Sequence, residues 1–338
     1  MTVQTSFSQK NILITGGAGF IGSHLCERFL KDGHRVICVD NLSTGEASNI
    51  ESLLQNNSFR FIRLDVNQAF DLELFPELAP FKLPFQGIQE IYHFACPTSI
   101  KQFDQYKIQT LLSNSIGNYH VLELAKKYRS KIMLASSSVV YGSRHDGDTS
   151  VSEEQIGTVD HLSARACYDE GKRFSETMFS TYRDVHGIDI RIARIFRTYG
   201  PRMPIADGHL IPDFILNAYA GKDLVLYGGK DFRTSLVYVS DVIDGLVRLM
   251  DTPEDPGPTN IGSDVDLSLR EVAEKIVSLM HSTSKLVEGE NFVFLSELSL
   301  PRIDRAKELG WFPLVRLEDG LMRTIEYLKA NQLLLTSL

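Results

Sequence analysis

The sequence predicts an α/β protein with a doubly wound parallel sheet, helices on both of its faces, and a smaller α/β lobe toward the C-terminus. The main observation is a series of apolar runs that alternate with helix-like stretches, the pattern of a parallel sheet buried on both faces. The runs are residues 11–14, 35–39, 59–64, 90–95, 131–135 and 188–195. After residue 201 the pattern changes to shorter helices mixed with proline, glycine and charged residues, which indicates the second lobe.

Periodicity places the helices between these runs. Apolar residues recur at helical spacing in the main domain over residues 23–31, 113–127 and 168–185. In the second lobe helices are predicted at residues 209–220, 240–251, 268–281 and 318–330. Residues 70–87 are rich in Leu, Phe and Pro without clean periodicity, so an irregular loop is predicted there.

Two domains follow from this order of elements. Residues 1–196, together with about 236–262, are expected to form the sheet domain. Residues 197–235 and 263–338 are expected to form the smaller lobe, which would bind substrate because ligands of such folds bind beyond the carboxyl ends of the strands.

Composition excludes several classes of partner. The 338 residues are 43% hydrophobic and 23% charged, with a net charge of -8 and scattered basic residues, so neither nucleic acid nor an anionic membrane is an expected partner. No apolar run approaches the roughly 20 residues of a membrane span. Residues 1–10 are polar and lack the apolar core of a signal peptide, so a cytoplasmic location is expected.

The cysteines and histidines show no metal-binding or disulfide spacing. The four cysteines, Cys26, Cys38, Cys96 and Cys167, are expected to be reduced and mostly buried. The nine histidines form no ligand cluster, and we predict no metal.

A glycine-rich segment connects the first predicted strand to the first predicted helix. Residues 15–22 read TGGAGFIG. Glycines at these positions let backbone amides approach a pyrophosphate, the helix N-terminus favours the anion, and Gly22 allows the helix to pack closely on the sheet. The segment therefore predicts a dinucleotide site of the Rossmann type.

Asp40 indicates which dinucleotide is bound. It ends the second predicted strand, about 20 residues after the glycines, where a carboxylate can accept hydrogen bonds from both adenosine ribose hydroxyls. A 2'-phosphate would be repelled by this carboxylate. NAD is therefore favoured over NADP.

Tyr168 and Lys172 are the candidate reacting groups. Residues four apart on a helix lie on one face, so a single site can use both. A phenol is a weak base at neutral pH, and a nearby ammonium group would lower its pKa, so that Tyr168 could deprotonate a substrate hydroxyl.

A run of serines lies between the glycine segment and this pair. Residues 134–142 read LASSSVVYG, an apolar strand that ends in hydroxyl groups at the expected carboxyl edge of the sheet. Hydroxyl groups at that edge can hydrogen-bond a reacting oxygen, and plain turn chemistry is the alternative interpretation of the run.

The chain resembles the extended short-chain dehydrogenase/reductases that modify nucleotide sugars, and among them most closely the UDP-glucuronate decarboxylases, also called UDP-xylose synthases. The resemblance covers nearly the whole chain. Its most specific segments are residues 91–97, 167–173, 191–196, 198–203 and 238–241.

The resemblance implies which residues bind NAD and which react. The implied cofactor residues are Gly16, Gly19, Phe20, Ile21, Gly22, Asp40, Asn41, Asp65, Val66, Ala95, Tyr168 and Lys172. Tyr168, Lys172 and Ser137 would form the catalytic triad. In that family hydride leaves C4 of the sugar for NAD⁺, the 4-keto sugar is altered, and the same cofactor returns the hydride.

One departure from the family concerns the reaction. The decarboxylases carry a glutamate two residues before the tyrosine of their Tyr-Gly pair, and here that position is Val139. Ser138 and Val139 also argue against a dehydratase, which needs acids in this stretch to move protons. A neutral serine run is similar to that of the 4-epimerases.

Other departures concern the substrate. Arg197 stands where the family usually has asparagine, Thr234 where it has arginine, and His209 where it has arginine. We expect Arg197 to hold an acidic group of the ligand, with a salt bridge outside the pocket as the alternative. Arg233 is one residue away from the expected arginine, and residues 297–302 (ELSLPR) leave Arg302 as the only cation in a normally arginine-rich stretch. The predicted substrate contacts are Pro97, Ser138, Val139, Arg197, Arg202, His209, Arg233 and Arg302.

These observations predict an NAD-dependent enzyme that oxidises C4 of a nucleotide sugar, with UDP-glucuronate decarboxylation, a lyase reaction of carbohydrate biosynthesis, as the first choice. The alternatives are a 4-epimerase, a 4-dehydrogenase that releases the keto sugar, and a catalytically weak NAD-binding sensor or structural protein. The resemblance also implies a homodimer, formed through the helices predicted at residues 113–127 and 168–185.

Overall fold

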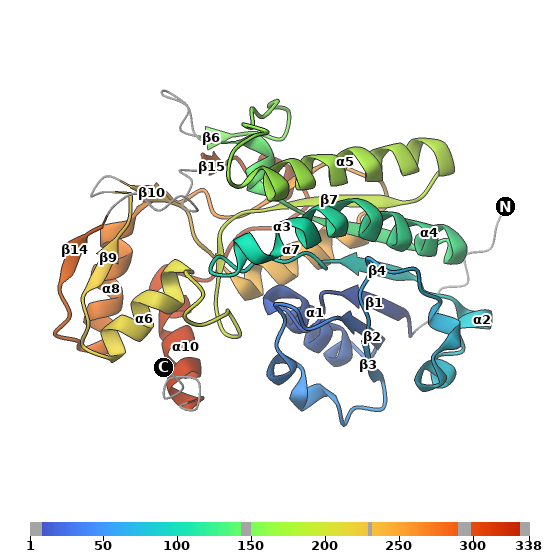
Figure 1. The fold of residues 1–338 in the computed structure, drawn as a ribbon, viewed down its shortest axis with the longest axis horizontal. Helices are drawn as coiled ribbons and strands as arrows, with labels where there is room; N and C mark the ends of the chain where they lie inside the picture. The colour runs from blue at the N-terminus through green and yellow to red at the C-terminus, as the bar shows by residue number, and fades with distance from the viewer. Residues whose placement is uncertain (1–8, 143–149, 229–231, 290–298, 332–338) are drawn as a thin grey trace. The chain divides into compact units, whose positions relative to one another are not determined.

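The computed structural model describes residues 9–142, 150–228, 232–289 and 299–331. Its main sheet has seven strands in the order β12-β7-β5-β4-β1-β2-β3, and the strand pairs with assigned registers are all parallel. The strands are β1 (Asn11–Thr15), β2 (Arg35–Asp40), β3 (Phe59–Arg63), β4 (Glu90–His93), β5 (Lys131–Ser137), β7 (Ile190–Ile195) and β12 (Thr259–Ile261). The predicted α/β fold class is confirmed (Figure 1).

Six of these strands coincide with the predicted apolar runs. The helices that coincide with predicted ones are α1 (Phe20–Lys31), α4 (Asn118–Tyr128), α5 (Ala166–His186), α6 (Leu210–Tyr219), α7 (Val239–Asp251), α8 (Leu269–Met280) and α10 (Leu317–Ala330). The sequence did not predict α2 (Leu83–Gln86), α3 (Phe103–Leu112) or α9 (Asp304–Glu308). A π-helical turn, η5 (Ser113–Gly117), joins α3 to α4, so the helix predicted from residue 113 begins ten residues earlier.

The remaining elements are short. The two- and three-residue strands pair as β6 (Ser150–Val151) with β15 (Leu300–Pro301), β8 (Thr198–Tyr199) with β11 (Val237–Tyr238), β9 (Leu224–Leu226) with β14 (Leu286–Glu288), and β10 (Arg233–Thr234) with β13 (Leu267–Ser268). The 3-10 helices are η1 (Ala47–Asn49), η2 (Glu51–Leu53), η3 (Leu72–Leu74), η4 (Pro76–Phe81) and η6 (Ser138–Tyr141).

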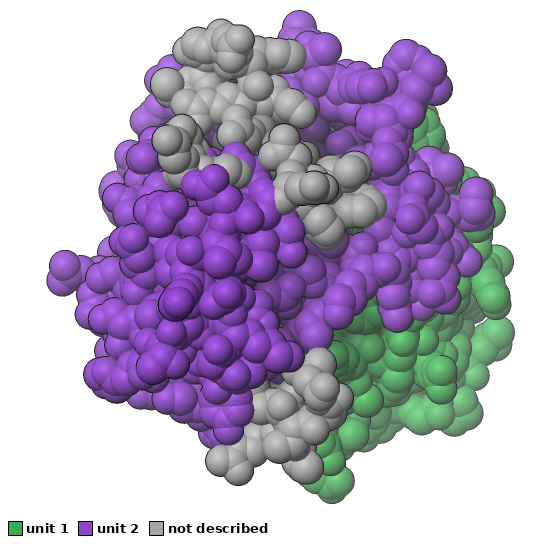
Figure 2. Space-filling view, turned by 60° about the vertical axis from the view of Figure 1, so that its left-hand side comes forward, with its two compact units in different colours: residues 1–97, 112–135, 174–192 green, residues 98–111, 136–173, 193–338 purple. Residues whose placement is uncertain are grey.

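The chain forms two compact units, which Figure 2 colours separately. Unit 1 comprises Met1–Pro97, Leu112–Ala135 and Phe174–Ile192. Unit 2 comprises Thr98–Leu111, Ser136–Arg173 and Ala193–Leu338.

In unit 1 the strands bury both of their faces. Ile37 and Val39 of β2 belong to a core cluster with Val121 of α4 and Phe179 of α5. Cys38, which points to the opposite face because side chains alternate along a strand, hydrogen-bonds Cys26 of α1. The buried runs that the sequence shows therefore reflect a sheet covered on two sides.

Residues 70–87 are more ordered than the sequence predicts. Instead of an irregular loop they form η3, η4 and α2. Leu72, Leu78, Phe81 and Leu83 are buried in the same core cluster as the strands. The apolar residues of this segment serve packing, and 3-10 turns are too short to show a period in the sequence.

In unit 2, α7 packs against Trp311, which precedes α10 in the chain. Trp311 is fully buried, and its indole Nε1–H donates to the carbonyl oxygen of Asp241 in α7 at 2.8 Å. A Cβ at Gly245 would lie 2.9 Å from that indole ring, so the glycine allows the close approach.

Two further observations bear on function. Within the described ranges no helix is both long and apolar enough to cross a membrane. The same ranges contain no group of three or more His, Cys, Asp or Glu side chains arranged to hold a metal ion.

Candidate active site

The glycine-rich turn is held in a conformation that other residues would not tolerate. Gly16 has a φ of 71°, in the left-handed region that favours glycine, and a Cβ there would lie 2.7 Å from the backbone of Phe94. A Cβ at Gly22 would lie 2.2 Å from the carbonyl oxygen of Gly16. The turn, the first turn of α1 and the end of β4, including Ala95, therefore lie in close backbone contact.

The start of α1 suits an anion. The helix begins at Phe20, its N-cap Gly19 provides no side-chain hydrogen bond, and its first turn contains no acidic residue. Backbone N–H groups at such an end can bind a phosphate, and the helix dipole adds favourable charge. These features fit the pyrophosphate of a dinucleotide bound at Gly19, Phe20, Ile21 and Gly22.

Asp40 is fixed by two backbone amides. Its carboxylate accepts hydrogen bonds from the N–H of Ala18 at 3.0 Å and from the N–H of Leu42 at 2.8 Å. Burial raises the pKa of this carboxyl above its ordinary value of 3.8. A carboxylate has further lone pairs beyond these two bonds, so it can also accept the ribose hydroxyls of NAD.

Replacing Asp40 by asparagine is expected to weaken NAD binding about ten- to hundredfold, because charge-assisted hydrogen bonds to the ribose are lost. Since the pKa of Asp40 is raised, acidification should protonate it earlier than an ordinary aspartate. Wild-type affinity should therefore fall as the pH drops toward that pKa, and the variant should lack this component. Isothermal titration of NAD at several pH values tests this, and identical profiles for the two proteins would contradict it.

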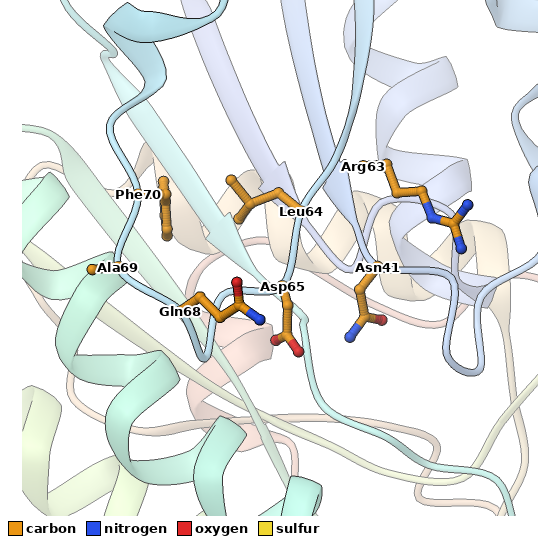
Figure 3. Close-up of a pocket in the computed structure, with 7 residues that line it drawn as sticks. All are labelled: Asn41, Arg63, Leu64, Asp65, Gln68, Ala69 and Phe70. Atoms are coloured by element: carbon orange, nitrogen blue, oxygen red, sulfur yellow. The ribbon is translucent and has the colours of Figure 1, made fainter.

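A pocket of about 410 Å³ lies beyond the ends of β2 and β3 (Figure 3). It is lined by Asn41, Arg63, Leu64, Asp65, Gln68, Ala69 and Phe70. Two of these, Asn41 and Asp65, are predicted cofactor residues. The mixture of apolar walls with amide and carboxylate groups fits a flat heterocycle that carries an amino group, such as adenine.

His120 of α4 supports one wall of this pocket, and the sequence did not single it out. Its Nδ1 donates to the carbonyl oxygen of Val66 at 2.8 Å, and its ring packs edge-on against Phe70. Val66 itself is buried and contributes its backbone here. A histidine in the middle of an amphipathic helix gives no local signal of such a role.

A chain of buried polar side chains runs behind the glycine turn. His93 contacts Thr15 Oγ1 through Nδ1 at 2.6 Å and Asn118 Oδ1 through Nε2 at 2.9 Å. The amide of Asn118 donates to Ser175 Oγ at 2.8 Å and to the carbonyl oxygen of Asn114 at 2.7 Å. Because Asn118 Oδ1 must accept, His93 carries a proton on Nε2.

The same network reaches the π-helical turn. Ser175 Oγ donates to Asn114 Oδ1 at 3.0 Å, and Asn114 Nδ2 donates to Cys96 Sγ at 3.2 Å. Fully satisfied buried networks specify one arrangement of a core. This one fastens β1, β4, η5 and α5 of unit 1, and sequence reasoning did not identify it.

Tyr168 and Lys172 lie on one face of α5, as predicted. Lys172 is only 5% exposed, and its Nζ lies 5.8 Å from the centroid of the Tyr168 ring. A buried ammonium group over a phenol ring stabilises negative charge on the phenol oxygen.

Ser137 lies at the end of β5 in the same unit. It is the N-cap of η6, where its Oγ accepts a hydrogen bond from the N–H of Val139 at 3.4 Å. Arg173, the neighbour of Lys172, donates to the carbonyl oxygens of Val140 at 3.1 Å and Gly157 at 2.8 Å. The segment after Ser137 is therefore bound directly to the helix that carries Tyr168 and Lys172.

Val139 occupies its position as a packed apolar residue. It is 6% exposed, and its neighbour Ser138 is 4% exposed. The position at which the family resemblance predicts a glutamate thus has no ionisable group in this chain.

Arg197 contacts Thr234, which is another position where the sequence departs from the family pattern. Its Nη1 donates to Thr234 Oγ1 at 2.5 Å, and its guanidinium lies 5.9 Å from the centroid of the Phe232 ring. Burial, together with the positive charge of Arg165, lowers the pKa of Arg197 to about 10. Arg197 is still charged at neutral pH.

Three other predicted substrate contacts, Arg233, Arg302 and His209, each lie beside a carboxylate. Arg233 binds Asp266 at 2.9 Å, and Arg302 binds Asp304 at 2.9 Å, both as exposed ion pairs. His209 lies 3.4 Å from Asp207, whose carboxylate also accepts from Ser99.

The remaining members of the predicted set are placed as follows. Pro97 is buried, and Arg202 is half-buried with a φ of 66°. Residues 297 and 298 of the stretch that departs from the family lie outside the described residues.

The sequence of this chain is similar to that of known proteins over most of its length. Residues 12–262 match the model of the NAD-dependent epimerase/dehydratase family. The chain is 40% identical over 331 residues to UDP-glucuronic acid decarboxylase 1 of Xenopus tropicalis, which covers 95% of this chain and 72% of that protein. It is 39% identical to UDP-glucuronic acid decarboxylase 5 of Arabidopsis thaliana, over 94% of this chain and 89% of that protein.

A solved structure extends the comparison. UDP-glucuronic acid 4-epimerase from Bacillus cereus, in complex with UDP-glucuronic acid and NAD, aligns with a TM-score of 0.79 at 26% identity over 95% of this chain and 99% of that one. The predicted family and the predicted NAD cofactor are confirmed by these matches. The chain belongs to the NAD-dependent epimerase/dehydratase family and is an enzyme of its decarboxylase and epimerase type.

Proposed function

We propose that this enzyme oxidises the C4 hydroxyl of a UDP-linked sugar, with UDP-glucuronate as its substrate and decarboxylation as its net reaction. The observation that carries the proposal is the fastening of α5 to the segment after Ser137 through Arg173, which keeps Tyr168, Lys172 and Ser137 within one compact unit. The identity to UDP-glucuronic acid decarboxylases over most of the chain supports the choice of substrate.

Each residue has a defined role in this proposal. The glycine turn, Asp40 and the pocket with Asn41 and Asp65 would hold NAD. When bound, NAD⁺ supplies the hydride acceptor for C4 and later the hydride donor. Tyr168 accepts the proton of the C4 hydroxyl, Lys172 stabilises the resulting phenolate, and Ser137 hydrogen-bonds the C4 oxygen.

Decarboxylation follows from the chemistry of the oxidised sugar. A ketone at C4 makes the glucuronate a β-keto acid. The C5–C6 bond then breaks, its electron pair moves toward the C4 carbonyl oxygen, and carbon dioxide leaves. The enolate that remains takes a proton from solvent at C5, which restores the C4 ketone. When hydride returns to C4, Tyr168 gives its proton to the C4 oxygen, and the C4 hydroxyl is restored.

A second candidate is UDP-glucuronate 4-epimerisation, and Val139 is the observation that favours it. An epimerase needs oxidation at C4, rotation of the keto sugar and hydride return to the other face, without a carboxylate at position 139. A 4-dehydrogenase that released the keto sugar would share these requirements and would also need an oxidant to restore NAD⁺.

Mass spectrometry of the purified protein incubated with UDP-glucuronate tests these reactions together. Decarboxylation yields carbon dioxide and a UDP-pentose, epimerisation yields an isomer of unchanged mass, and net oxidation yields a ketone two hydrogens lighter together with NADH absorbance. We expect the UDP-pentose. Absence of turnover by protein that retains NAD would exclude UDP-glucuronate as the substrate.

We also propose that the enzyme is a homodimer whose interface includes apolar side chains of unit 1. Leu112, Ile116 and Tyr119 are exposed at helical spacing, as are Phe174 and Val185 of α5. The hydroxyl of Tyr182 binds Glu123 at 3.0 Å, which holds α4 and α5 side by side. A second copy presenting the same face would bury these residues.

Replacing Phe174 by glutamate is expected to convert the dimer into a monomer, because a charge would be buried in the apolar interface. Light scattering coupled to size-exclusion chromatography measures the mass. The matched control is Phe85→Glu, since Phe85 is 91% exposed on α2, outside the proposed interface, and should leave the dimer intact. A dimer that persisted in Phe174→Glu would place the interface elsewhere.

The cellular location and the functional domains are further proposals. A cytoplasmic location agrees with the four free cysteines, and thiol labelling after cell fractionation tests it. We assign NAD binding to residues 1–196 and about 236–262, and substrate binding to residues 197–235 and 263–338. Hydrogen exchange measured with NAD alone and then with UDP should protect these two sets separately.

A further inference from the structure

One short stretch of chain forms a large part of the pocket beyond β2 and β3. Residues 65–70, which we call the pocket wall, contribute Asp65, Gln68, Ala69 and Phe70 to its lining. Figure 3 shows these side chains spread along one loop. The wall belongs to no helix or strand, so its shape depends on the contacts that hold it.

The chain is fixed on either side of the wall. Before it, the N–H of Leu64 donates to the carbonyl oxygen of Asp40, at the end of β2, at 3.1 Å. After it, Lys127 of α4 binds Asp71 at 3.1 Å, but the two side chains are 41% and 44% exposed, and such surface ion pairs contribute little stability. Both of these contacts lie outside the wall itself.

His120 of α4 holds the middle of the wall. Its Nδ1–H donates to the carbonyl oxygen of Val66 at 2.8 Å, and its ring packs edge-on against Phe70 with the centroids 6.4 Å apart. Val66 is 4% exposed, and within the described ranges its carbonyl oxygen accepts no other hydrogen bond. A buried carbonyl group that loses its donor is costly.

A second link between the wall and the π-helical turn is weaker. Asn67 Nδ2 donates to Ser113 Oγ at 3.4 Å, which is long for a hydrogen bond of this type. The bond from His120 to Val66 is shorter by 0.6 Å. His120 therefore provides the stronger of the two hydrogen bonds that join the wall to the segment of η5 and α4.

The carbonyl group that His120 holds lies inside a turn that orients Asp65. The carboxylate of Asp65 accepts from the N–H of Asn67 at 2.9 Å, and its carbonyl oxygen accepts from the N–H of Gln68 at 3.0 Å. Val66 is the residue between these groups. Fixing Val66 therefore fixes the turn as a unit, and with it the directions in which Asp65 and Gln68 face the pocket.

We propose that His120 is a positioning residue of the cofactor site, which acts through Val66 and Phe70 to keep the pocket wall in shape for the adenine half of NAD. His120 does not itself line the pocket. Its effect should therefore fall on the adenine half and spare the nicotinamide half. The inference rests on the proposed assignment of the pocket to adenine, and it is independent of the sugar and of the net reaction.

Three substitutions of His120 separate its hydrogen bond from its packing. His120→Asn keeps a donor, because the amide nitrogen of asparagine is as many bonds from Cα as Nδ1 of histidine. His120→Leu keeps most of the volume without a donor, and His120→Ala removes both. The proteins are compared by their thermal unfolding, which identifies any variant that is not folded.

The matched control is His34→Leu. His34 is half-buried like His120, its Nδ1 accepts from the N–H of Lys10 at 3.4 Å, and its ring lies 6.2 Å from that of Phe29. It precedes β2, whereas the pocket lies beyond the other end of that strand. The control thus loses a similar set of contacts in unit 1 without disturbing the wall.

Calorimetry gives the dissociation constants for NAD, for AMP and for nicotinamide mononucleotide. His120→Leu and His120→Ala are expected to bind NAD and AMP about tenfold more weakly, since each must restore the wall on binding, and to bind nicotinamide mononucleotide as the wild type does. His120→Asn should stay within about threefold of the wild type for all three ligands. His34→Leu should bind all three unchanged.

Three results would overturn the proposal. One is wild-type affinity for AMP in both donor-free variants, and another is an equal loss for AMP and nicotinamide mononucleotide, which would reveal a general structural defect. The third is His120→Asn binding as poorly as His120→Leu, because a restored donor would then have no effect.

Hydrogen exchange locates the change and separates this inference from the assignment of the pocket. Backbone amides of residues 66–70 should exchange about tenfold faster in His120→Leu, while those of β1 keep their wild-type rates. AMP should slow exchange of the same amides in the wild type. Wild-type protein without that protection binds adenine elsewhere, which overturns both the assignment and the role of His120. Protection by AMP in the wild type, with His120 variants that bind AMP equally well, overturns only the role of His120.

Discussion

Replacing Tyr168 by phenylalanine is expected to lower kcat by about 10²- to 10⁴-fold, the contribution of a positioned general base. The change removes one oxygen atom and keeps the aromatic ring under Lys172, so folding and NAD content should not change. Without the phenol, Ser137 and Lys172 remain, but no group accepts the proton of the C4 hydroxyl. Turnover of UDP-glucuronate with saturating substrate gives kcat, and the absorbance of the released cofactor gives the NAD content.

The matched control is Tyr182→Phe on the same helix. The hydroxyl of Tyr182 binds Glu123 at 3.0 Å, which is a structural contact, so its loss should leave kcat within about twofold of the wild type. Equal rates for Tyr168→Phe and wild-type protein would show that another group is the base. They would also favour the reading of a catalytically weak NAD-binding protein.

Replacing Gly22 by alanine is expected to abolish stable NAD binding and to lower the free energy of unfolding by about 1–3 kcal/mol or more. The added Cβ would lie 2.2 Å from the carbonyl oxygen of Gly16 and 2.9 Å from the Cα of Gly17. Both neighbours are backbone atoms of the turn, so the helix and the turn must separate. That separation moves the amides of Phe20 and Ile21 away from the pyrophosphate.

Gly33→Ala at the other end of α1 is the control for this change. Gly33 has a φ of 84°, but a Cβ there would meet no atom within 4 Å. The substitution should cost about 1 kcal/mol of backbone strain and leave NAD binding unchanged. Denaturant unfolding and NAD titration measure the two effects, and retention of NAD by Gly22→Ala would contradict the close packing described for the turn.

The elements that the sequence predicts well share one property, which is that their signal is local. Strands of the main sheet are short apolar runs because both faces are covered, so β1 to β5 and β7 appear directly as such runs. The glycine turn, Asp40 and the pair of Tyr168 and Lys172 are recognisable because a strand, a turn and a helix occur in sequence order. These features predict the cofactor and the candidate reacting groups.

Some features escaped the sequence because their signal is weak or distributed. The strand β12 has only three residues and joins the sheet beside β7, more than sixty positions away. Residues 70–87 have no period, since 3-10 turns with buried apolar side chains produce none. His93, Asn118 and Ser175 are ordinary polar residues in the sequence, and only their meeting in the core of unit 1 makes them a network.

The sequence by itself determined the fold class, the family and the NAD cofactor, and it predicted the groups that would bind NAD and move a proton, because each depends on residues close together in the chain or on extended similarity. Only the tertiary structure showed that two of the departures from the family pattern, Arg197 and Thr234, contact each other. Arg197 and Thr234 are separated by a helix and two strands, and nothing in their spacing indicates contact. Their hydrogen bond exists because the segments that carry them run side by side, a consequence of long-range strand pairing that no local pattern encodes.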